Sequence, residues 1–293
     1  MKTVIHIGCP KTGTTTLQRH LFRELPQTHY LGHYSRINPK LHKVPHGARD
    51  AGELAAEWRQ AVAAAPAETT LLLYSQEKLT YYPASLAPEV ADAIHKIVGD
   101  AEVLITIRRQ PAICVSNYFN FTARGYPHDF DTFMKEGLAT LETSATMATH
   151  RSEESIWGLW LYDDLFRAWE ERFGTVHVLP LEAWKQQPDQ ARAALAAALG
   201  RDVDDIVLPS AHARSRASNT PWRRHLPRPL EQFLKRLPLP EWAHAKMSKG
   251  LDIELTPEQL QTIEATYGPG NRWLAERTGW DLKALGYPGW PTE

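Results

Sequence analysis

Short apolar runs and longer amphipathic stretches alternate along most of the chain. Four runs rich in leucine or β-branched residues predict buried β-strands, at residues 3–8, 69–77, 101–111 and 175–184. Apolar residues at helical spacing predict helices at residues 14–25, 51–67, 88–99, 112–125, 156–174, 189–200 and 256–279. Because strands and helices alternate, we expect an α/β fold in which a parallel β-sheet is flanked by helices on both faces.

Two stretches interrupt this alternation. Residues 126–155 have no clear period and predict an irregular or short-helical insertion, and residues 209–240 are rich in Arg, Pro and Ser and predict a loop. The sequence contains no internal repeat and no low-complexity linker. We therefore expect residues 1–293 to form a single domain.

Composition narrows the function classes without selecting one. The 293 residues are 43% hydrophobic and 23% charged with a formal net charge of -1, which favours neither nucleic acid nor a membrane as partner. No apolar run approaches the roughly 20 residues that span a bilayer, and the N-terminus does not have the form of a signal peptide. Cys9 and Cys114 fall in predicted core elements, not in a disulfide framework. We expect a cytoplasmic protein.

The first predicted strand runs into a glycine-rich turn, in the sequence VIHIGCPKTGTTTLQRHLF (residues 4–22). A strand, a tight turn and a helix start form an anion site, because free backbone N–H groups and the helix dipole favour negative charge. Gly8 and Gly13 have the spacing of the Walker A pattern G-x-x-x-x-G-K-[ST], but Lys11 precedes the second glycine and Thr14 follows it. This order favours a short diphosphate-like group over a triphosphate with magnesium. The alternative is a plain strand-to-helix turn with Lys11 in solvent.

A second candidate site follows the third predicted strand, in ITIRRQPAICVSNYFN (residues 105–120). Arg108 and Arg109 lie at the carboxyl end of that strand, the edge where open parallel sheets bind ligands. Ser116 comes eight residues after Arg108 and lies early in the next predicted helix. An arginine and a hydroxyl in this arrangement grip one phosphate from two sides. The alternative is an arginine pair that only forms salt bridges.

The second predicted strand delivers a carboxylate to the same edge of the sheet. It ends in LLLYSQEKLTYY (residues 71–82), which places Glu77 near both anion sites. A carboxylate there is a candidate general base for an acceptor hydroxyl or amine. The alternative is a surface pair of Glu77 with Lys78. Three histidines rank below Glu77 because none stands in a base motif: His6, His29 and His33.

Several of these segments resemble one enzyme family. PKTGTT after a buried strand, and RRQ followed by Ser-x-Tyr, are similar to the sulfotransferases that use 3′-phosphoadenosine 5′-phosphosulfate, in their bacterial form. VHVLPLEAW and NRWLAERTGWDLKALGYP are similar to the same family. The resemblance implies a P-loop-like sulfotransferase fold over most of the chain. It also implies in-line sulfuryl transfer to a hydroxyl or amine, with adenosine 3′,5′-bisphosphate as product and no metal ion.

The resemblance also implies residue roles at the reacting end of the donor. Lys11 contacts the bridging oxygen and the sulfuryl group. EKLTYY resembles the EKSANYF-like stretch of the heparan N-sulfotransferase group, in which a glutamate is the proposed base, so Glu77 takes that role. The loop holds the 5′-phosphate through its backbone and through the hydroxyls of Thr14 and Thr15. The residues involved are Thr12, Gly13, Thr14, Thr15 and Thr16.

At the other end of the donor, the resemblance implies that Arg108 and Ser116 hold the 3′-phosphate, with Arg109 as the alternative arginine. SRASNTPWRR (residues 215–224) resembles the late loop that closes over the cofactor. Its candidate contacts to the 3′-phosphate or the adenine are Arg216, Asn219 and Arg223. The alternative for this segment is a basic surface loop.

Two other functions stay open on the sequence. One is a P-loop kinase or NTPase that acts on a small molecule with a displaced lysine, although no Walker B aspartate ends a predicted strand. The other is a nucleotide-binding regulatory protein without chemistry. For the acceptor we expect a small molecule, a carbohydrate or a lipid headgroup, bound in a pocket lined by residues 29–46 and 126–155. We expect no nucleic-acid partner and no bound metal, since no Cys/His cluster has metal-ligand spacing.

Overall fold

The computed structural model describes residues 1–44, 47, 49–82, 84–122, 126–139, 156–203 and 253–290. Within these ranges five strands form one sheet in the order β2-β3-β1-β4-β5, and every neighbouring pair is parallel. The strands are β1 (Lys2–Gly8), β2 (Thr28–Gly32), β3 (Leu71–Ser75), β4 (Glu102–Ile107) and β5 (Val176–Pro180). The predicted α/β class and the parallel sheet are therefore confirmed.

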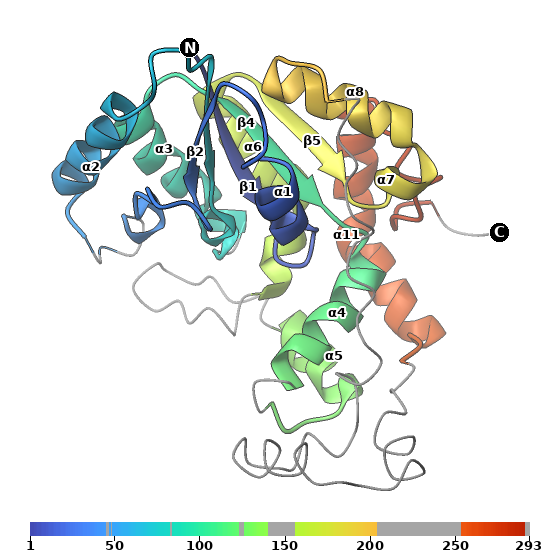
Figure 1. Cartoon of the computed structure of the whole chain (residues 1–293). Helices are drawn as coiled ribbons and strands as arrows, with labels where there is room; N and C mark the ends of the chain where they lie inside the picture. Colours follow the sequence, from blue (N-terminus) through green and yellow to red (C-terminus); the bar gives the residue numbers. More distant parts are fainter. Residues whose placement is uncertain are drawn as a thin grey trace, which may run out of the picture.

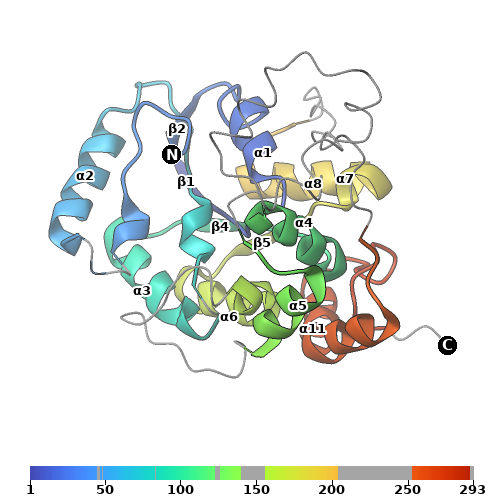
Figure 2. The same ribbon diagram turned by 90° about the horizontal axis from the view of Figure 1, so that it is seen from below.

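Helices cover both faces of the sheet, as predicted. Figures 1 and 2 show α1 and α8 on one face and α3 and α6 on the other, with α11 beside α6. The α-helices are α1 (Thr14–His20), α2 (Ala51–Ala63), α3 (Ala87–Val98), α4 (Gln110–Thr122), α5 (Phe130–Ala139), α6 (Tyr162–Phe173), α7 (Ala183–Gln186), α8 (Pro188–Leu199) and α11 (Pro257–Thr278). Short 3-10 turns are η1 (Leu41–Lys43), η2 (Glu77–Thr80), η3 (Ala84–Leu86) and η4 (Ile156–Trp160).

The central strands form because their residues are apolar on both faces. All five residues of β3 are buried, and Val4, Ile5 and Ile7 of β1 have no exposed surface. A strand covered on both faces by helices needs a nearly continuous apolar run, not an alternating one. The helix ends follow the expected chemistry: Gly99 and Gly200 end α3 and α8 with positive φ, and Thr256 opens α11 with a capping box.

The structure corrects three details of the sequence prediction. β2 was not predicted, and it forms the edge of the sheet beside β3. The helix predicted over residues 156–174 is divided, because η4 is followed by Leu161 at φ -78 and ψ 78 before α6 begins. α1 ends at His20 instead of residue 25, since Leu21 has φ -120 and ψ -70. α5 lies within the stretch predicted as irregular or short-helical.

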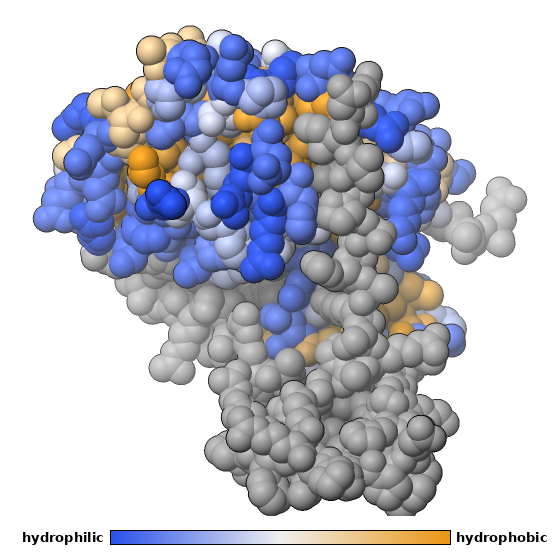
Figure 3. Space-filling model, viewed as in Figure 1, coloured by the Kyte–Doolittle hydropathy of each residue, from blue (hydrophilic) through white to orange (hydrophobic). Residues whose placement is uncertain are grey.

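On the face shown in Figure 3, the described residues are mostly hydrophilic, with small hydrophobic areas between them. Among the described residues, Met1 and Leu260 are the exposed large hydrophobic side chains. None of the helices in the described ranges combines the length and the apolar character that crossing a membrane requires.

Candidate functional site

The strand order places a ligand-binding edge at β1. From β1 the chain goes to the outer edge strand β2, returns through β3, and then passes to β4 on the other side of β1. Connections that leave in opposite directions create a crevice outside the carboxyl ends of the strands, where open α/β sheets bind ligands. Figure 2 looks onto this end of the sheet. The segments after β1, β3 and β4 all reach it, and they contain Lys11, Glu77 and Arg108.

The turn between β1 and α1 depends on two glycines. Gly13 has φ 84, a left-handed conformation that glycine adopts freely, and an added Cβ would lie 2.7 Å from Leu181 Cδ1. At Gly8 an added Cβ would lie 2.0 Å from Thr14 Cγ2, so only glycine allows the helix to approach the strand this closely. Lys11 also has a positive φ, 68°, which is uncommon for a residue with a side chain. The turn is therefore tightly specified at all three positions.

Thr12 fixes this turn from the inside. Its side chain is 1% exposed, and its hydroxyl donates to the carbonyl oxygen of Cys9 at 2.6 Å. Its backbone N–H donates to the same oxygen at 3.3 Å, and its hydroxyl oxygen lies 2.8 Å from Thr106 Oγ1 on β4. Cys9 N donates in turn to the carbonyl oxygen of Thr106 at 3.2 Å. The turn is thus bonded to β4 through both side chain and backbone.

A fully buried histidine lies behind the turn. His6 Nδ1 is 2.7 Å from Ser75 Oγ and Nε2 is 3.3 Å from Thr106 Oγ1, while Gln18 Nε2 donates to Ser75 Oγ at 2.9 Å. Burial lowers the pKa of His6 to about 3, so the ring is neutral. Since Thr12 gives its only hydroxyl proton to Cys9, Thr106 donates to Thr12. His6 then donates from Nε2 and accepts from Ser75 at Nδ1.

The other two histidines considered from the sequence lie elsewhere. His29 Nε2 is 2.9 Å from the carbonyl oxygen of Ala61 on α2. His33 is exposed, and its ring packs edge-on against Tyr34 with the centroids 4.2 Å apart. Glu77, in contrast, contacts the β1–α1 turn directly, through the hydroxyl of Thr14.

Two hydroxyl groups hold the carboxylate of Glu77. Thr14 Oγ1 donates to Oε2 at 2.9 Å, and Tyr81 OH donates to Oε1 at 3.0 Å. Thr80 joins the start of η2 to β1, because its hydroxyl lies 2.9 Å from the carbonyl oxygen of Glu77 and 3.1 Å from that of Gly8. The carboxylate is half-buried. Each of its oxygens therefore has a fixed donor, and one donor belongs to the turn that was predicted to bind phosphate.

Arg108 contacts the same turn from the other side. Its Nη1 donates to the carbonyl oxygen of Lys11 at 3.2 Å, and Tyr162 OH donates to the carbonyl oxygen of Arg108 at 2.7 Å. Burial lowers the pKa of Arg108, although Glu182 and Tyr162 act in the opposite direction. Within the described ranges no carboxylate lies at ion-pair distance from its guanidinium. Arg108 is thus a half-buried cation that has no ion-pair partner among the described residues, although Glu182 acts on it from a longer distance.

Arg109 is placed differently. It is exposed, its Nε lies 4.0 Å from Glu182 Oε1, and its backbone N–H donates to the same oxygen at 3.3 Å. Glu182 Oε2 accepts a hydrogen bond from Tyr287 OH at 3.0 Å. Of the two arginines, Arg108 is the one that contacts the turn.

Ser116 lies in α4, six positions after its first residue, which is about 9 Å along the helix axis. It is 2% exposed. The start of α4 is fixed by a pair of side-chain amides: Gln110 Nε2 donates to Asn271 Oδ1 and Asn271 Nδ2 donates to Gln110 Oε1, each at 3.1 Å. In the sequence, Gln110 was noted only as part of RRQ, and no local pattern predicted its contact with Asn271 in α11.

The remaining predicted site residues lie at the start of α1 or outside the described part of the chain. Thr15 is exposed and Thr16 is half-buried, and Thr16 N donates to the carbonyl oxygen of Gly13 at 2.9 Å. The backbone N–H groups of Thr14 and Thr15 have no acceptor among the described residues, as expected at the start of a helix. Three predicted contacts lie outside the described residues: Arg216, Asn219 and Arg223.

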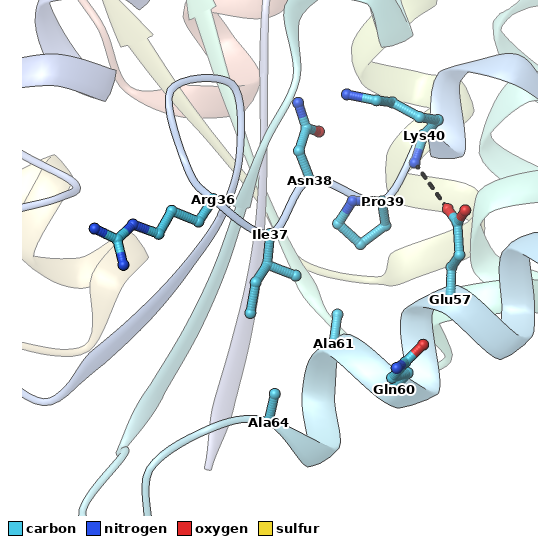
Figure 4. Close-up of a pocket in the computed structure, with 9 residues that line it drawn as sticks. All are labelled: Arg36, Ile37, Asn38, Pro39, Lys40, Glu57, Gln60, Ala61 and Ala64. Carbon is cyan, nitrogen blue, oxygen red and sulfur yellow. Dashed lines mark hydrogen bonds between the residues drawn. The ribbon is translucent and has the colours of Figure 1, made fainter.

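A pocket of about 360 Å³ lies between α2 and the segment that follows β2 (Figure 4). Residues 36–40 form one wall and the second half of α2 forms the other. The dashed line in Figure 4 marks the bond from Lys40 N to Glu57 Oε2, 3.4 Å long. The described lining includes none of Lys11, Glu77 and Arg108. The acceptor pocket expected along residues 29–46 therefore stays a prediction.

The described residues offer no cluster of three or more His, Cys, Asp or Glu side chains that could hold a metal ion. Both cysteines are free and buried, and burial raises the pKa of the Cys9 thiol to about 12. The chemical groups at the β1–α1 turn are therefore two cations, one carboxylate, hydroxyls and backbone N–H groups. Together with the sheet order, they define an α/β protein whose first strand leads into the glycine-containing turn that was predicted to bind an anion.

Comparisons with known proteins extend this description to the fold as a whole. No family model and no curated protein sequence matches the chain. Among solved structures, a sulfotransferase from Alicyclobacillus acidocaldarius superposes with a TM-score of 0.63 at 15% identity, over 97% of this chain and 98% of that chain. The chain therefore has the fold of a sulfotransferase. At this identity the likeness concerns the fold alone.

Two further solved structures are similar with lower scores. The sulfotransferase domain of the Synechococcus PCC 7002 olefin synthase has a TM-score of 0.40 at 14% identity, over 96% of this chain and 95% of that chain. The sulfotransferase domain of the curacin biosynthetic pathway has a TM-score of 0.39 at 14% identity, over 90% and 97%. With scores this low, neither adds to the assignment of the fold.

Proposed function

We propose that this protein is a sulfotransferase that moves a sulfuryl group from 3′-phosphoadenosine 5′-phosphosulfate to an acceptor hydroxyl or amine. One observation carries the proposal: the PKTGTT turn contacts both a carboxylate and a cation. Thr14 in the turn donates a hydrogen bond to Glu77, and the half-buried Arg108 donates one to the carbonyl oxygen of Lys11. Sulfuryl transfer needs an anion cradle, a cation at the leaving oxygen and a base for the acceptor, all at one place. The fold shared with a known sulfotransferase supports the same conclusion.

The proposal assigns the turn to the 5′ end of the donor. The N–H groups of Thr14 and Thr15, which have no acceptor in the described part of the chain, bind the 5′-phosphate together with the hydroxyls of these residues. Gly13 allows the close approach of the phosphate, and Thr16 assists. Thr12 contributes by shaping the turn, since its hydroxyl and N–H both face the carbonyl oxygen of Cys9. The side chain of Lys11 binds the bridging oxygen and the sulfuryl group.

The proposal assigns Arg108 and Ser116 to the 3′-phosphate. A half-buried arginine that has no ion-pair partner among the described residues is stabilised by a bound anion, and the phosphate supplies one. A site with phosphate grips at two ends selects the phosphosulfate donor over ATP, which has no 3′-phosphate. Arg216 and Asn219 complete the proposed cofactor contacts.

In the proposed reaction, the acceptor oxygen or nitrogen attacks the sulfur in line with the bridging oxygen. The proton of the acceptor passes to Glu77, the new bond to sulfur forms, and the bond from sulfur to the bridging oxygen breaks. The electron pair stays on that oxygen, which becomes part of the 5′-phosphate of adenosine 3′,5′-bisphosphate. Lys11 stabilises the charge that develops there.

The proposal leaves the acceptor as a class: a small molecule, a carbohydrate or a lipid headgroup. It treats residues 1–293 as one sulfotransferase domain. It also includes a cytoplasmic location, which the two free and buried cysteines support.

The test is transfer from sulfur-labelled 3′-phosphoadenosine 5′-phosphosulfate to a library of phenols, sugars, amines and lipid headgroups. Glu77→Gln should abolish transfer while the affinity for adenosine 3′,5′-bisphosphate, measured by calorimetry, stays nearly unchanged. Glu276→Gln is the matched control, because Glu276 is exposed on α11 and should behave as wild type. Normal turnover in Glu77→Gln would remove Glu77 from its role. Magnesium-dependent ATP hydrolysis without bisphosphate binding would favour a P-loop kinase or NTPase instead.

A further inference from the structure

Thr14 belongs to two parts of the site at once. It is the first residue of α1, in the turn proposed to hold the 5′-phosphate, and its hydroxyl donates to Glu77 Oε2 at 2.9 Å. The side chain is only 3% exposed, so water does not compete freely for this bond. A threonine hydroxyl has one proton to donate. It therefore cannot donate fully to the carboxylate and to a phosphate oxygen at the same time.

The Glu77 carboxylate and the 5′-phosphate are hydrogen-bond acceptors of similar strength. Hydrogen bonds to a carboxylate and to a phosphate are both charge-assisted, so neither is negligible beside the other. A change of partner requires only rotation of the hydroxyl about its Cβ–Oγ1 bond, with no movement of the backbone. Tyr81 OH holds the other oxygen, Oε1, at 3.0 Å, so the carboxylate keeps its place when Thr14 turns away.

We propose that Thr14 couples donor binding to the base: without donor its hydroxyl occupies Oε2 of Glu77, and on donor binding the hydroxyl turns to the 5′-phosphate and leaves Oε2 free. The inference rests on the proposed function and deepens it, because it names the oxygen that takes the acceptor proton and the event that releases it. Oε2 then accepts the proton that leaves the acceptor. Before the donor arrives, Thr14 takes one of the two lone pairs of that oxygen, so both are free for the acceptor's proton only in the complex that has something to transfer.

The coupling has a measurable consequence for affinity. In wild type, the bond that Thr14 gains with the phosphate is offset by the bond that it loses with Glu77. Thr14→Val keeps the shape of the side chain and removes the hydroxyl, so it should weaken binding of adenosine 3′,5′-bisphosphate by no more than about twofold. In a Glu77→Ala background there is no bond to give up, so the same change should weaken binding about tenfold, equivalent to roughly 1.4 kcal/mol.

The experiment is a double-mutant cycle by calorimetry on wild type, Thr14→Val, Glu77→Ala and the double variant. The loss of the Glu77 charge affects binding in both backgrounds and cancels in the cycle. Tyr81→Phe is the matched control: Tyr81 also donates to Glu77, but it does not lie in the turn, so its cycle with Glu77→Ala should show no coupling in bisphosphate affinity. Thr14→Ser keeps the hydroxyl and should bind as wild type does.

The outcomes separate this inference from the function on which it rests. A larger effect of Thr14→Val in the Glu77→Ala background, together with normal binding by Thr14→Ser, supports the coupling. Equal effects in both backgrounds, in a wild type that binds bisphosphate and transfers sulfuryl groups, overturn the coupling and leave the proposed function intact. A wild type that neither binds bisphosphate nor uses the phosphosulfate donor overturns both. Thermal unfolding of every variant shows whether a weak binder is folded.

Discussion

His6 should make the stability of this protein fall in mild acid. The side chain has no exposed surface, and burial lowers its pKa from 6.5 to about 3. Below pH 6.5 the unfolded chain takes up a proton on this residue that the folded protein does not take up until about pH 3. The free energy of unfolding therefore decreases as the pH falls through this window. At pH 7 most unfolded chains are neutral at this residue, so His6 lowers the free energy of unfolding only slightly there.

The magnitude follows from the same two values. A pH of 5 lies about 1.5 units below the pKa of the unfolded residue, which is therefore protonated, whereas the folded residue is still neutral. Each unit corresponds to about 1.36 kcal/mol, so His6 alone should lower the free energy of unfolding by roughly 2 kcal/mol between pH 7 and pH 5. That is a large part of the total for a typical domain, about 5–15 kcal/mol.

His6→Gln isolates this contribution. The glutamine oxygen replaces Nδ1 as acceptor for Ser75, and its amide group replaces Nε2 as donor to Thr106, but the side chain does not titrate. All other titrating groups are shared, so they cancel in the difference between the two proteins. Urea unfolding at pH 7, 6 and 5 should show wild type losing roughly 2 kcal/mol more than His6→Gln.

A matched control uses a histidine on the surface. His20 is exposed at the end of α1, so His20→Gln should follow the wild-type curve. The reasoning is refuted if wild type and His6→Gln lose the same free energy of unfolding between pH 7 and pH 5. That result would mean that the ring is charged in the folded protein, and the order of donors derived for the bonds behind the turn would be wrong.

Three further predictions concern the surroundings of the site. Gly8→Ala places a Cβ 2.0 Å from Thr14 Cγ2, so urea unfolding should show a loss of about 1–3 kcal/mol, and an unchanged midpoint would contradict the packing. Gln110→Leu leaves the buried amide of Asn271 without one partner and should cost about 1–3 kcal/mol in the same assay, whereas the Gln110→Leu/Asn271→Leu double variant should recover part of it. Arg108→Lys loses the forked donor, so calorimetry should show bisphosphate affinity about tenfold lower, and wild-type affinity would assign the 3′-phosphate to another residue.

The sequence predicted the four strands that contain an apolar run and missed β2, which does not. β1, β3, β4 and β5 contain apolar runs that are visible without a partner. β2 is THYLG, and only its last two residues are buried, so its pattern does not differ from that of a loop. Its assignment as a strand depends on pairing with β3, which no local pattern reports. In η4, the sequence IWGLW is apolar throughout and extends the helical pattern of α6, although the backbone breaks at Leu161.

For the site, the sequence could predict at which edge of the sheet the residues lie, but not which hydrogen bonds join them. Lys11, Glu77 and Arg108 each follow a parallel strand closely, and the carboxyl ends of such strands meet at one edge. The contacts that join them involve residues far apart in the sequence. Arg108 reaches the carbonyl oxygen of Lys11 across 97 positions, and Thr14 reaches Glu77 across 63. Tyr81 is close to Glu77 in sequence, but its orientation depends on the turn of η2, which the pattern of apolar residues does not specify.

The bonds around the β1–α1 turn indicate which parts of the proposed donor site are fixed before a ligand binds. Thr12 is bonded to β4, Thr80 donates to the carbonyl oxygen of Gly8, and Arg108 donates to that of Lys11, so the backbone of the turn is held from three sides. An anion site with a fixed backbone does not have to reorganise its N–H dipoles when charge develops in the transition state. In the coupling proposed above the hydroxyl of Thr14 differs, because it exchanges Glu77 for the 5′-phosphate by rotation about one bond. In such a site, substitutions behind the turn should weaken donor binding and turnover together, whereas loss of the Thr14 hydroxyl should leave bisphosphate affinity within about twofold of wild type.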